Sequence, residues 1–589
     1  MKNINTLVLL LCIAMFSRAS TSITSSSIAG HWTLSGSPYL IFNSVTIDSN
    51  NTLVIDPGVN VILQGDYQLK VKGILHADGS PSQYINFHRN DTTGWSDTAI
   101  ALGGWGGMIV DNSYLGTDSV TFSYCNISDM KSSDIQTEDR RLGIRHCTFF
   151  HNKSGVMDIG ATNRTIEISH CKFYDNEYYV MHFWLGKAIF LDNSVYNNIG
   201  VHIIYFAYAS VDINQNLIYD NLPTDLNNEG ALVLYYCKAS ITNNKIYGNV
   251  LGQIAALAAW GSEVHINGNY ICNNKVLRGS TGAACGMAEG GGAIRLSNSG
   301  DTTYQLNVVC NNIIANNYAG YAGSAVYIYG SNVKIYNNDI ANNSGGTVPD
   351  GAPIAVNDNS AIGGTYVSVK NNIFYNNVAF ISGSSFSDTL NVQVSWADTF
   401  EFNHNYIERT IGSDAYFDYS AITHLGDTSN NIVDTAQQLM SPTRFCSDTE
   451  SALLADFRLR SASACIDKGD SAGCVPANTD YWHNQRMSGT KIDIGAYEFQ
   501  YPVNGVSKIS RTERSIEVYP NPAKEIVRIV TQQNSGTITV VDMTGKEVNR
   551  IVVCRYITEF DVRNLKKGAY FIRWMSLSGD LAQNKFIVE

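Results

Sequence analysis

Charged residues are scarce in this sequence, and long apolar or basic runs are few. Lys, Arg, Asp and Glu together make up 16% of the chain, against about 25% in typical soluble domains. The formal net charge is −12 and no run of Lys or Arg occurs, so the composition argues against a nucleic-acid partner. Neutral or cationic ligands and divalent metal stay open. The main apolar run, residues 6–16, is too short to span a membrane.

Several catalytic and metal-binding signatures are also absent. The sequence has no HExxH, P-loop or GxSxG pattern and no Cys or His spacing typical of zinc, so the enzyme classes that these patterns define are not indicated. Gly (49) and Tyr (33) are instead abundant. This composition favours stacked strands with an amide-rich and aromatic exterior over a helical protein.

A six-residue phrase recurs along the middle of the chain. It begins with Asn or Cys, has an apolar third residue and ends with Asn, and its copies start 24, 22, 23, 28, 25, 43, 26 and 34 residues apart. A period in the twenties with a few long gaps indicates a solenoid with insertions on some turns. The copies are CTFFHN (147–152), CKFYDN (171–176), NSVYNN (193–198), NLIYDN (216–221), NKIYGN (244–249), NYICNN (269–274), NIIANN (312–317), NDIANN (338–343) and NIFYNN (372–377).

Short alternating runs surround each phrase. Val211 and Ile213, for example, alternate with polar residues before Asn216, and a strand that often opens with Gly follows each phrase. Period-two alternation predicts strands, so each coil has three short strands and no room for a helix, as in a parallel β-helix. A leucine-rich repeat is the rival solenoid, because I-x-x-N-x-I matches part of its consensus. The few leucines, the missing L-x-x-L and the Gly-led strand argue against it.

The Asn column has a physical explanation. Asn tolerates bent backbone conformations, and its amide can bond neighbouring backbone. Coils stack about 4.8 Å apart, so the amides of successive coils can also bond one another in a ladder. Cys125, Cys147 and Cys171 occupy this column in the early coils and are predicted to be buried, inert fillers.

The N-terminal residues predict export. Lys2, the apolar run and the small-residue stretch Ser17-Arg18-Ala19 predict a signal peptide over residues 1–19. Without Cys12 the chain keeps eleven cysteines, and an odd number in an exported protein leaves at least one thiol free or bonded to another chain. The connectivity of any disulfide is left open.

Residues 20–410 are predicted to form the solenoid. The phrases IDPGVNVIL at 55–63 and GGWGGMIV at 103–110 resemble the first coils of exported bacterial right-handed parallel β-helix proteins, which implies a right-handed β-helix here. Trp32 and Tyr39 are predicted to cover the first coil, whose open strand edge invites association.

Residues 411–500 lose the repeat and are predicted to form the C-terminal cap of the β-helix. The stretches IDKGD at 466–470 and IDIGAYE at 492–498 resemble a C-terminal segment common in extracellular β-helix proteins. In one interpretation Asp467, Asp493 and Arg486 form a charge-assisted network that closes the last coil. In the other, Asp467, Asp470 and Asp493 form a metal site, for which Ca²⁺ is the expected ion.

The last residues predict a second domain. Residues 501–514 are expected to be a linker, and residues 515–589 alternate Val, Ile and Phe with turn residues, which predicts a small antiparallel β-sandwich. The YPNP opening, the DMTGKEV hairpin and the LKKGAYF strand resemble the type IX secretion C-terminal sorting domain of Bacteroidetes. The resemblance implies contact with the type IX machinery, removal of this domain, and release or attachment at the outer cell surface.

The Gly-led strands supply the candidate site. Their sheet is expected to expose a ladder of aromatic and polar side chains suited to a polysaccharide, because rings stack on sugar faces while charged groups bond hydroxyls and carboxylates. Asp158 and His182 stand at equivalent positions in consecutive coils and are predicted to be neighbours. The candidate catalytic residues are Asp158, His182 and Arg295, and the candidate substrate-binding residues are Trp184, Tyr208, Tyr235, Trp260 and Tyr327.

Two classes of function remain. The first is a secreted or cell-surface protein that binds or cleaves polysaccharide along one sheet; if it is an enzyme, it is a polysaccharide lyase or a glycoside hydrolase. The second is a non-catalytic adhesin or structural protein whose elongated shape is its purpose. Clustering of carboxylates and rings in a groove would favour the first class.

Overall fold

The computed structural model describes most of the chain in two compact units. One unit lies within residues 1–475 together with 490–499, and the other within residues 476–489 together with 500–589. The residues described are 20–97, 102–111, 120–138, 142–161, 164–224, 230–277, 290–297, 306–320, 322–345, 352–357, 365–381, 385–387, 391–395, 397–408, 417–419, 422–443, 452–472, 479–500, 516–519, 521–524, 526–531, 536–543, 546–553, 557–575 and 581–589. The predicted signal peptide and the predicted linker lie outside these ranges.

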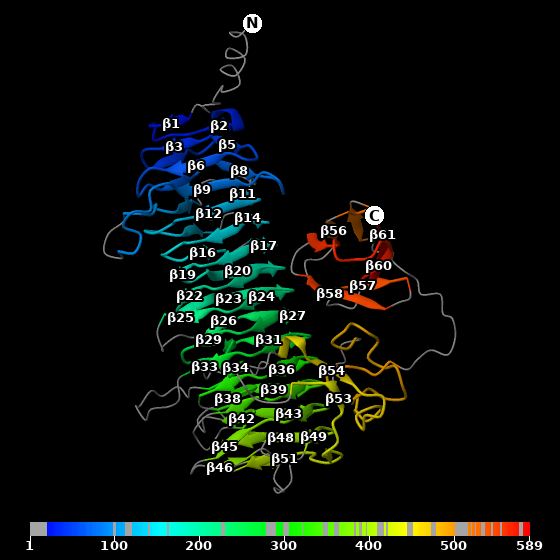
Figure 1. Cartoon of the computed structure of the whole chain (residues 1–589). Coiled ribbons are helices and arrows are strands. Elements are labelled where there is room, and N and C mark those ends of the chain that lie inside the picture. Colours follow the sequence, from blue (N-terminus) through cyan, green and yellow to red (C-terminus); the bar gives the residue numbers. More distant parts are fainter. Residues whose placement is uncertain are drawn as a thin grey trace. The chain divides into compact units, whose positions relative to one another are not determined.

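The first unit is a parallel β-solenoid (Figure 1). Within the described ranges there are strands and two short 3₁₀ helices, η1 (Leu34–Gly36) and η2 (Ala452–Leu454), but no α-helix. No helix in those ranges is long and apolar enough to cross a membrane. The predicted all-β class is confirmed.

Each coil of the solenoid contributes one strand to each of three rows. In one coil these are β30 (Leu257–Trp260), β31 (Glu263–Asn267) and β32 (Tyr270–Cys272). They pair in parallel and in register with β34 (Ile294–Ser297), β35 (Leu306–Cys310) and β36 (Ile313–Ala315) of the next coil. Three strands per coil is the predicted arrangement, and in the order of the coil these are called the first, second and third rows. Several middle coils, however, add a fourth strand of two residues, such as β29 (Val250–Leu251) and β33 (Lys275–Val276), which pair in parallel.

The strands of the first row, which carries the candidate site, include β10 (Met108–Val110), β13 (Ile135–Glu138), β16 (Met157–Gly160), β20 (Met181–Leu191), β23 (His202–Asn214), β26 (Gly230–Tyr235), β30, β34, β38 (Val326–Tyr329), β42 (Ile354–Asn357) and β47 (Val392–Val394). The long strands β20 and β23 run on into the second row. The third row includes β12 (Cys125–Ser128), β15 (Thr148–Phe150), β18 (Lys172–Tyr174), β21 (Ser194–Tyr196), β24 (Leu217–Tyr219), β28 (Lys245–Tyr247), β32, β36, β40 (Asp339–Ala341), β44 (Ile373–Tyr375), β49 (Tyr406–Glu408) and β52 (Ile432–Asp434).

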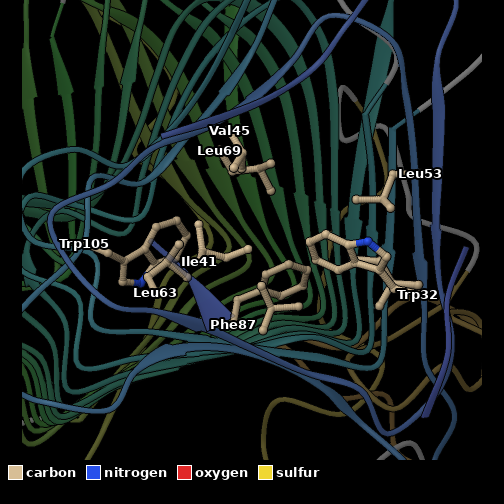
Figure 2. A pocket seen from close by; sticks show the side chains of 10 residues that line it. Trp32, Ile41, Val45, Leu53, Leu63, Leu69, Phe87 and Trp105 are labelled. Carbon is tan, nitrogen blue, oxygen red and sulfur yellow. The ribbon is translucent and has the colours of Figure 1, made fainter. Parts of the chain in front are cut away.

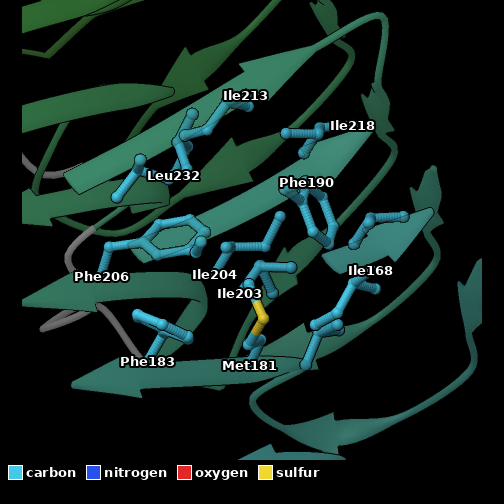
Figure 3. Close-up of a cluster of buried hydrophobic side chains, with 14 of the residues drawn as sticks. Ile168, Met181, Phe183, Phe190, Ile203, Ile204, Phe206, Ile213, Ile218 and Leu232 are labelled. Atoms are coloured by element: carbon cyan, nitrogen blue, oxygen red, sulfur yellow. The ribbon is translucent and has the colours of Figure 1, made fainter. Parts of the chain in front are cut away.

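Alternate residues of every row point into one continuous apolar core (Figure 3). In β20, Met181 and Phe183 face inward, and Ile204 and Phe206 of β23 lie beside them in register. The phenyl rings of Phe183 and Phe206 are 5.9 Å apart. The period-two pattern of the sequence therefore corresponds to a real inside and outside.

Two ladders of buried Asn side chains connect the coils at the corners of the third row. In the first ladder each Nδ2 donates to the Oδ1 of the next Asn over 2.9–3.2 Å, from Asn193 to Asn431. The second ladder runs from Asn152 to Asn377 over 2.8–3.2 Å. They correspond to the first and last residues of the repeated phrase.

The residue before each ladder position makes the turn. Asn243 and Asn337, which precede the first ladder, have φ of 58° and 56°, and Asn273, which precedes the second, has φ of 55°. This left-handed conformation suits Asn better than most residues. The two predicted tasks of Asn, bending the chain and bonding across coils, therefore fall to two adjacent residues.

Cysteine replaces asparagine at the start of the first ladder. The backbone N–H of Cys147 donates to Sγ of Cys171 at 3.4 Å, and the N–H of Cys171 donates to Oδ1 of Asn193 at 2.9 Å. All three early cysteines are buried and free, as are four later ones, Cys237, Cys272, Cys310 and Cys465.

The first coils enclose an apolar pocket (Figure 2). Trp32 and Tyr39 lie in these coils with their rings stacked 4.5 Å apart, and both side chains are buried. Trp105 and Phe87 line the same pocket further along the axis. Large rings thus fill the start of the core.

Residues 436–443, 452–472 and 490–499 lie along the outside of the third row. The hydroxyl of Tyr406 donates to the carbonyl of Ala436 at 2.6 Å, Nδ2 of Asn337 donates to the carbonyl of Asp493 at 3.1 Å, and the N–H of Ala496 donates to Asp339 at 3.1 Å. The third row is buried on both sides there. Meanwhile Val433, an inward position of the last coil, stays 41% exposed.

The second unit contains a small antiparallel sandwich. One sheet has β55 (Glu517–Tyr519), β56 (Ile526–Val530) and β59 (Ile557–Asp561), and the other has β58 (Glu547–Val553), β57 (Gly536–Asp542), β60 (Gly568–Met575) and β61 (Leu581–Val588). Their inward residues, among them Val527, Ile572 and Trp574, form a separate core. This confirms the predicted fold of the tail.

We predict that Asn269→Ala destabilises the solenoid. The amide of Asn269 accepts from the N–H and Nδ2 of Asn244 and donates to Oδ1 of Asn312 and the carbonyl of Ile241. Each buried partner left unsatisfied costs about 1–3 kcal/mol. Denaturant unfolding followed by tryptophan fluorescence should show a lower midpoint, whereas the exposed Asn90→Ala control should not. Equal midpoints would contradict the role given to the ladder.

Candidate functional site

Outward side chains of the first row form two columns along the solenoid. Because the strands pair in register, each outward residue lies beside its equivalents in the coils before and after. The first column runs through Gln136, Asp158, His182, Tyr205, Val233, Ala258, Arg295 and Tyr327. The second column runs through Gly160, Trp184, Ala207, Tyr235, Trp260 and Ser297.

The register brings two of the three candidate catalytic residues together. Asp158 of β16 pairs directly with His182 of β20, as their equivalent positions in the repeat predict. Arg295 lies four strands further along the same column, which is about 19 Å at the usual strand spacing. Asp158 and His182 can therefore act on one group of a ligand, and Arg295 belongs to a different part of the face.

The candidate binding residues differ in accessibility. Trp184 is 38% exposed and Tyr208 is 51% exposed, whereas Tyr327 is only 1% exposed. Tyr235 and Trp260 are half-buried in the second column. Tyr208 sits at a bend of β23 with φ of 53°, and its ring is 5.6 Å from that of Tyr235. The accessible rings thus gather over β20, β23 and β26.

Five rings, which we call the ring cluster, pack together on this part of the face. The ring of Tyr179 stacks on that of His182 at 3.8 Å. Tyr205 lies 5.6 Å from His182, 5.3 Å from Trp184 and 5.1 Å from His202. The cluster comprises Tyr179, His182, Trp184, His202 and Tyr205, and within it Trp184 is the exposed member.

A buried carboxylate anchors one end of the ring cluster. Asp134 is 2% exposed, and its Oδ2 accepts a hydrogen bond from the hydroxyl of Tyr179. Burial and this carboxylate raise the pKa of Tyr179, because both disfavour the phenolate. Tyr179 therefore stays a phenol at neutral pH, with its hydroxyl directed at Asp134.

His182 is neutral at neutral pH. Burial, with a further contribution from nearby His202, lowers the pKa of His182 to about 4, because both oppose a second positive charge. Its Nε2 is buried and, within the described part of the chain, has no hydrogen-bond partner. An imidazole nitrogen in this state can form a hydrogen bond with a ligand group that reaches it, as donor or as acceptor.

Arg295 stacks between two rings. Its guanidinium carbon lies 5.5 Å from the ring centroids of Trp260 and Tyr327, within the range of a cation–π contact. Its Nε donates to Oγ of Ser297 at 2.9 Å, and the side chain is 3% exposed. Arg295 thus holds this part of the face together.

Sequence reasoning missed Asp134, Tyr179, His202 and Tyr205. Tyr205 lies seven residues after ladder Asn198, whereas Asp158 and His182 lie six residues after theirs. One extra residue in that coil therefore hides Tyr205 from a comparison of equivalent positions. The contact of Asp134 with Tyr179 joins residues 45 apart, and no local pattern marks it.

The three candidate metal ligands bond to protein groups. Oδ1 of Asp467 accepts from the N–H groups of Thr490 and Lys491 at 2.6 and 2.9 Å. Oδ2 of Asp470 lies 2.5 Å from Nζ of Lys370. Asp493 accepts from the N–H groups of Asp467 and Phe499. Among the described residues, no group of three or more His, Cys, Asp or Glu is placed to hold a metal ion.

Comparison with known proteins supports both parts of the fold. Residues 81–199 and 113–309 match the right handed beta helix region family, and residues 517–589 match the secretion system C-terminal sorting domain family. The chain therefore contains a right-handed β-helix region and, after it, a secretion sorting domain. This type IX sorting domain implies a Bacteroidetes source and directs the chain to secretion and the cell surface.

No curated protein matches the chain. Among solved structures, a double mutant of the periplasmic alginate epimerase AlgG is similar over 69% of this chain and 84% of its own, with 11% identity and a TM-score of 0.24. A TM-score this low carries no functional argument.

We predict that His182 titrates near pH 4. A folded-state pKa below the usual ~6.5 of histidine means that the unfolded chain binds the proton first. The site should then lose stability as the pH falls from about 6.5 towards 4. Histidine NMR, with His182→Gln to assign the signal, measures the midpoint. A midpoint near 6.5 would contradict the burial seen here.

Proposed function

We propose that this secreted protein binds polysaccharide on the first row, over β16, β20, β23 and β26. The observation that carries the proposal is a pair of exposed rings: Trp184, which belongs to the ring cluster, and Tyr208. An aromatic face stacks on the apolar face of a sugar ring. The polar groups of Asp158 and His182, side by side at the same place, suit sugar hydroxyls.

The parallel register supports a chain-like ligand. Equivalent positions repeat at each strand, so the face offers similar contacts at regular steps along the solenoid axis. A polymer of similar units matches such a surface better than a single small molecule does. Ligand pockets of small molecules are usually concave and enclosed, whereas Trp184 and Tyr208 project from the sheet.

Cleavage of the bound polysaccharide is a second candidate, favoured by His182. The imidazole beside Asp158 is unprotonated at neutral pH, as a general base must be. A lyase would use it to remove a proton from an acidic sugar, and a hydrolase would need a second carboxylate as well. The non-catalytic alternative is an adhesin that uses the same rings for binding alone.

Binding is tested with the ring variants. We expect Trp184→Ala and Tyr208→Ala to weaken binding to a glycan array by about tenfold or more, since buried aromatic contacts carry much of a binding free energy. Phe42→Ala, which removes an exposed ring in the first coils, is the matched control. Equal binding by all variants, or no binding by the wild type, would refute the proposal.

Catalysis is tested separately with the same glycans. Unsaturated products and new reducing ends should appear with the wild type, and His182→Ala and Asp158→Asn should lower turnover by about 10²–10⁴-fold, the usual contribution of a general base. His424→Ala, at an exposed histidine of the last coil, should have no effect. Binding without turnover would assign the protein to the adhesin class.

A further inference from the structure

The outer face of the four-stranded sheet in the sorting domain carries large exposed apolar side chains. Along β60 and β61, alternate residues point into the sandwich core, among them Ile572, Trp574 and Phe586. The residues between them point outward, and these include Phe571, Met575 and Ile587, which are 39%, 44% and 44% exposed. The solvent face of an antiparallel sandwich is ordinarily polar.

Strand register gathers these side chains into one surface. Phe571 lies directly opposite Val541 of β57 on one side and Lys585 of β61 on the other. Ile587 is its diagonal neighbour, since it pairs with Ala569, and such neighbours lie within reach of an aromatic ring. We call this surface the outer patch: the exposed Phe571, Met575 and Ile587, with Arg573 and Lys585. Val541, opposite Phe571, is only 5% exposed and is not part of it.

The outer patch has a net positive charge, because Glu547, opposite Val541 on β58, is itself paired with Arg550 at 2.7 Å. Arg573 lies between Phe571 and Met575 on β60, and Lys585 lies two residues before Ile587 on β61. Both are outward and exposed. A complementary partner would therefore be apolar in the middle and acidic around it.

We infer that the outer patch is the surface through which the secretion machinery recognises this chain. Contiguous exposed apolar groups mark interaction sites, and a sorting domain must be read by a partner while it is folded. Among the described side chains of β56 in the other sheet, Ile526 is exposed, but Arg528 is its outward neighbour along that strand. A single exposed apolar residue is ordinary.

The test uses the full chain in a type IX-competent bacterium. Cell fractions and medium are probed with an antibody against the solenoid. We expect Phe571→Ser with Ile587→Ser to reduce the exported fraction by about tenfold, equivalent to ~1.4 kcal/mol of recognition, and to leave the chain in the periplasm. Arg573→Glu with Lys585→Glu, which keeps the apolar residues, should do the same.

Two controls make the result specific. Ile526→Ser removes an exposed apolar residue from the opposite sheet and should export normally. Limited proteolysis of the retained chains should leave the tail intact. Normal export of both the charge-reversed chain and the serine double variant would overturn the inference.

Two further outcomes would also overturn it. Normal export of a chain that lacks residues 515–589 would remove the sorting role of the tail itself. A wild-type dimer that Phe571→Ser breaks without changing export would assign the outer patch to self-association. Neither outcome affects the proposed binding of polysaccharide, which the solenoid alone carries.

Discussion

The hydrogen bond from one buried asparagine amide to the next is the interaction on which the solenoid depends. Apolar burial can stack strands, but it leaves the polar backbone at each tight corner without a partner, and such groups are costly when buried. The ladder amides satisfy these groups: Asn244 Nδ2, for example, also donates to the carbonyl of Ile213 in the preceding coil. The same contacts set the register, which a sheet of short strands specifies weakly on its own.

A fixed register decides what the outside of the molecule can do. Outward residues of successive coils become neighbours. Asp158 therefore pairs with His182, and the rings of Trp184 and Tyr205 lie 5.3 Å apart. Elsewhere the outside is covered. Residues 436–443, 452–472 and 490–499 bury the third row from Tyr270 to Tyr406, and Arg295 lies buried between its two rings. In the first row, the exposed rings Trp184 and Tyr208 lie in the middle coils.

Burial favours the uncharged forms of Tyr179 and His182 in the ring cluster. It raises the pKa of Tyr179 and lowers that of His182, because in each case the charged form is disfavoured. Both side chains are consequently neutral over a wide range around neutral pH. A surface built from neutral rings suits sugar faces, and Asp134 and Asp158 provide the carboxylates beside it.

The sequence by itself determined the coil: the repeated phrase specifies three strands, the inward apolar residues, the bent residue and ladder Asn at each corner, and the antiparallel tail. It also placed Asp158 beside His182, because their coils have equal lengths. Only the tertiary structure showed that Tyr205 and His202 join them, that Asp134 holds Tyr179, that Tyr327 is buried, and that residues 436–443, 452–472 and 490–499 lie along the side of the solenoid. The physical reason is that local periodicity is written in the spacing of neighbouring residues. Burial and long-range hydrogen bonds depend instead on how coils of unequal length stack and on which segments fold back over them.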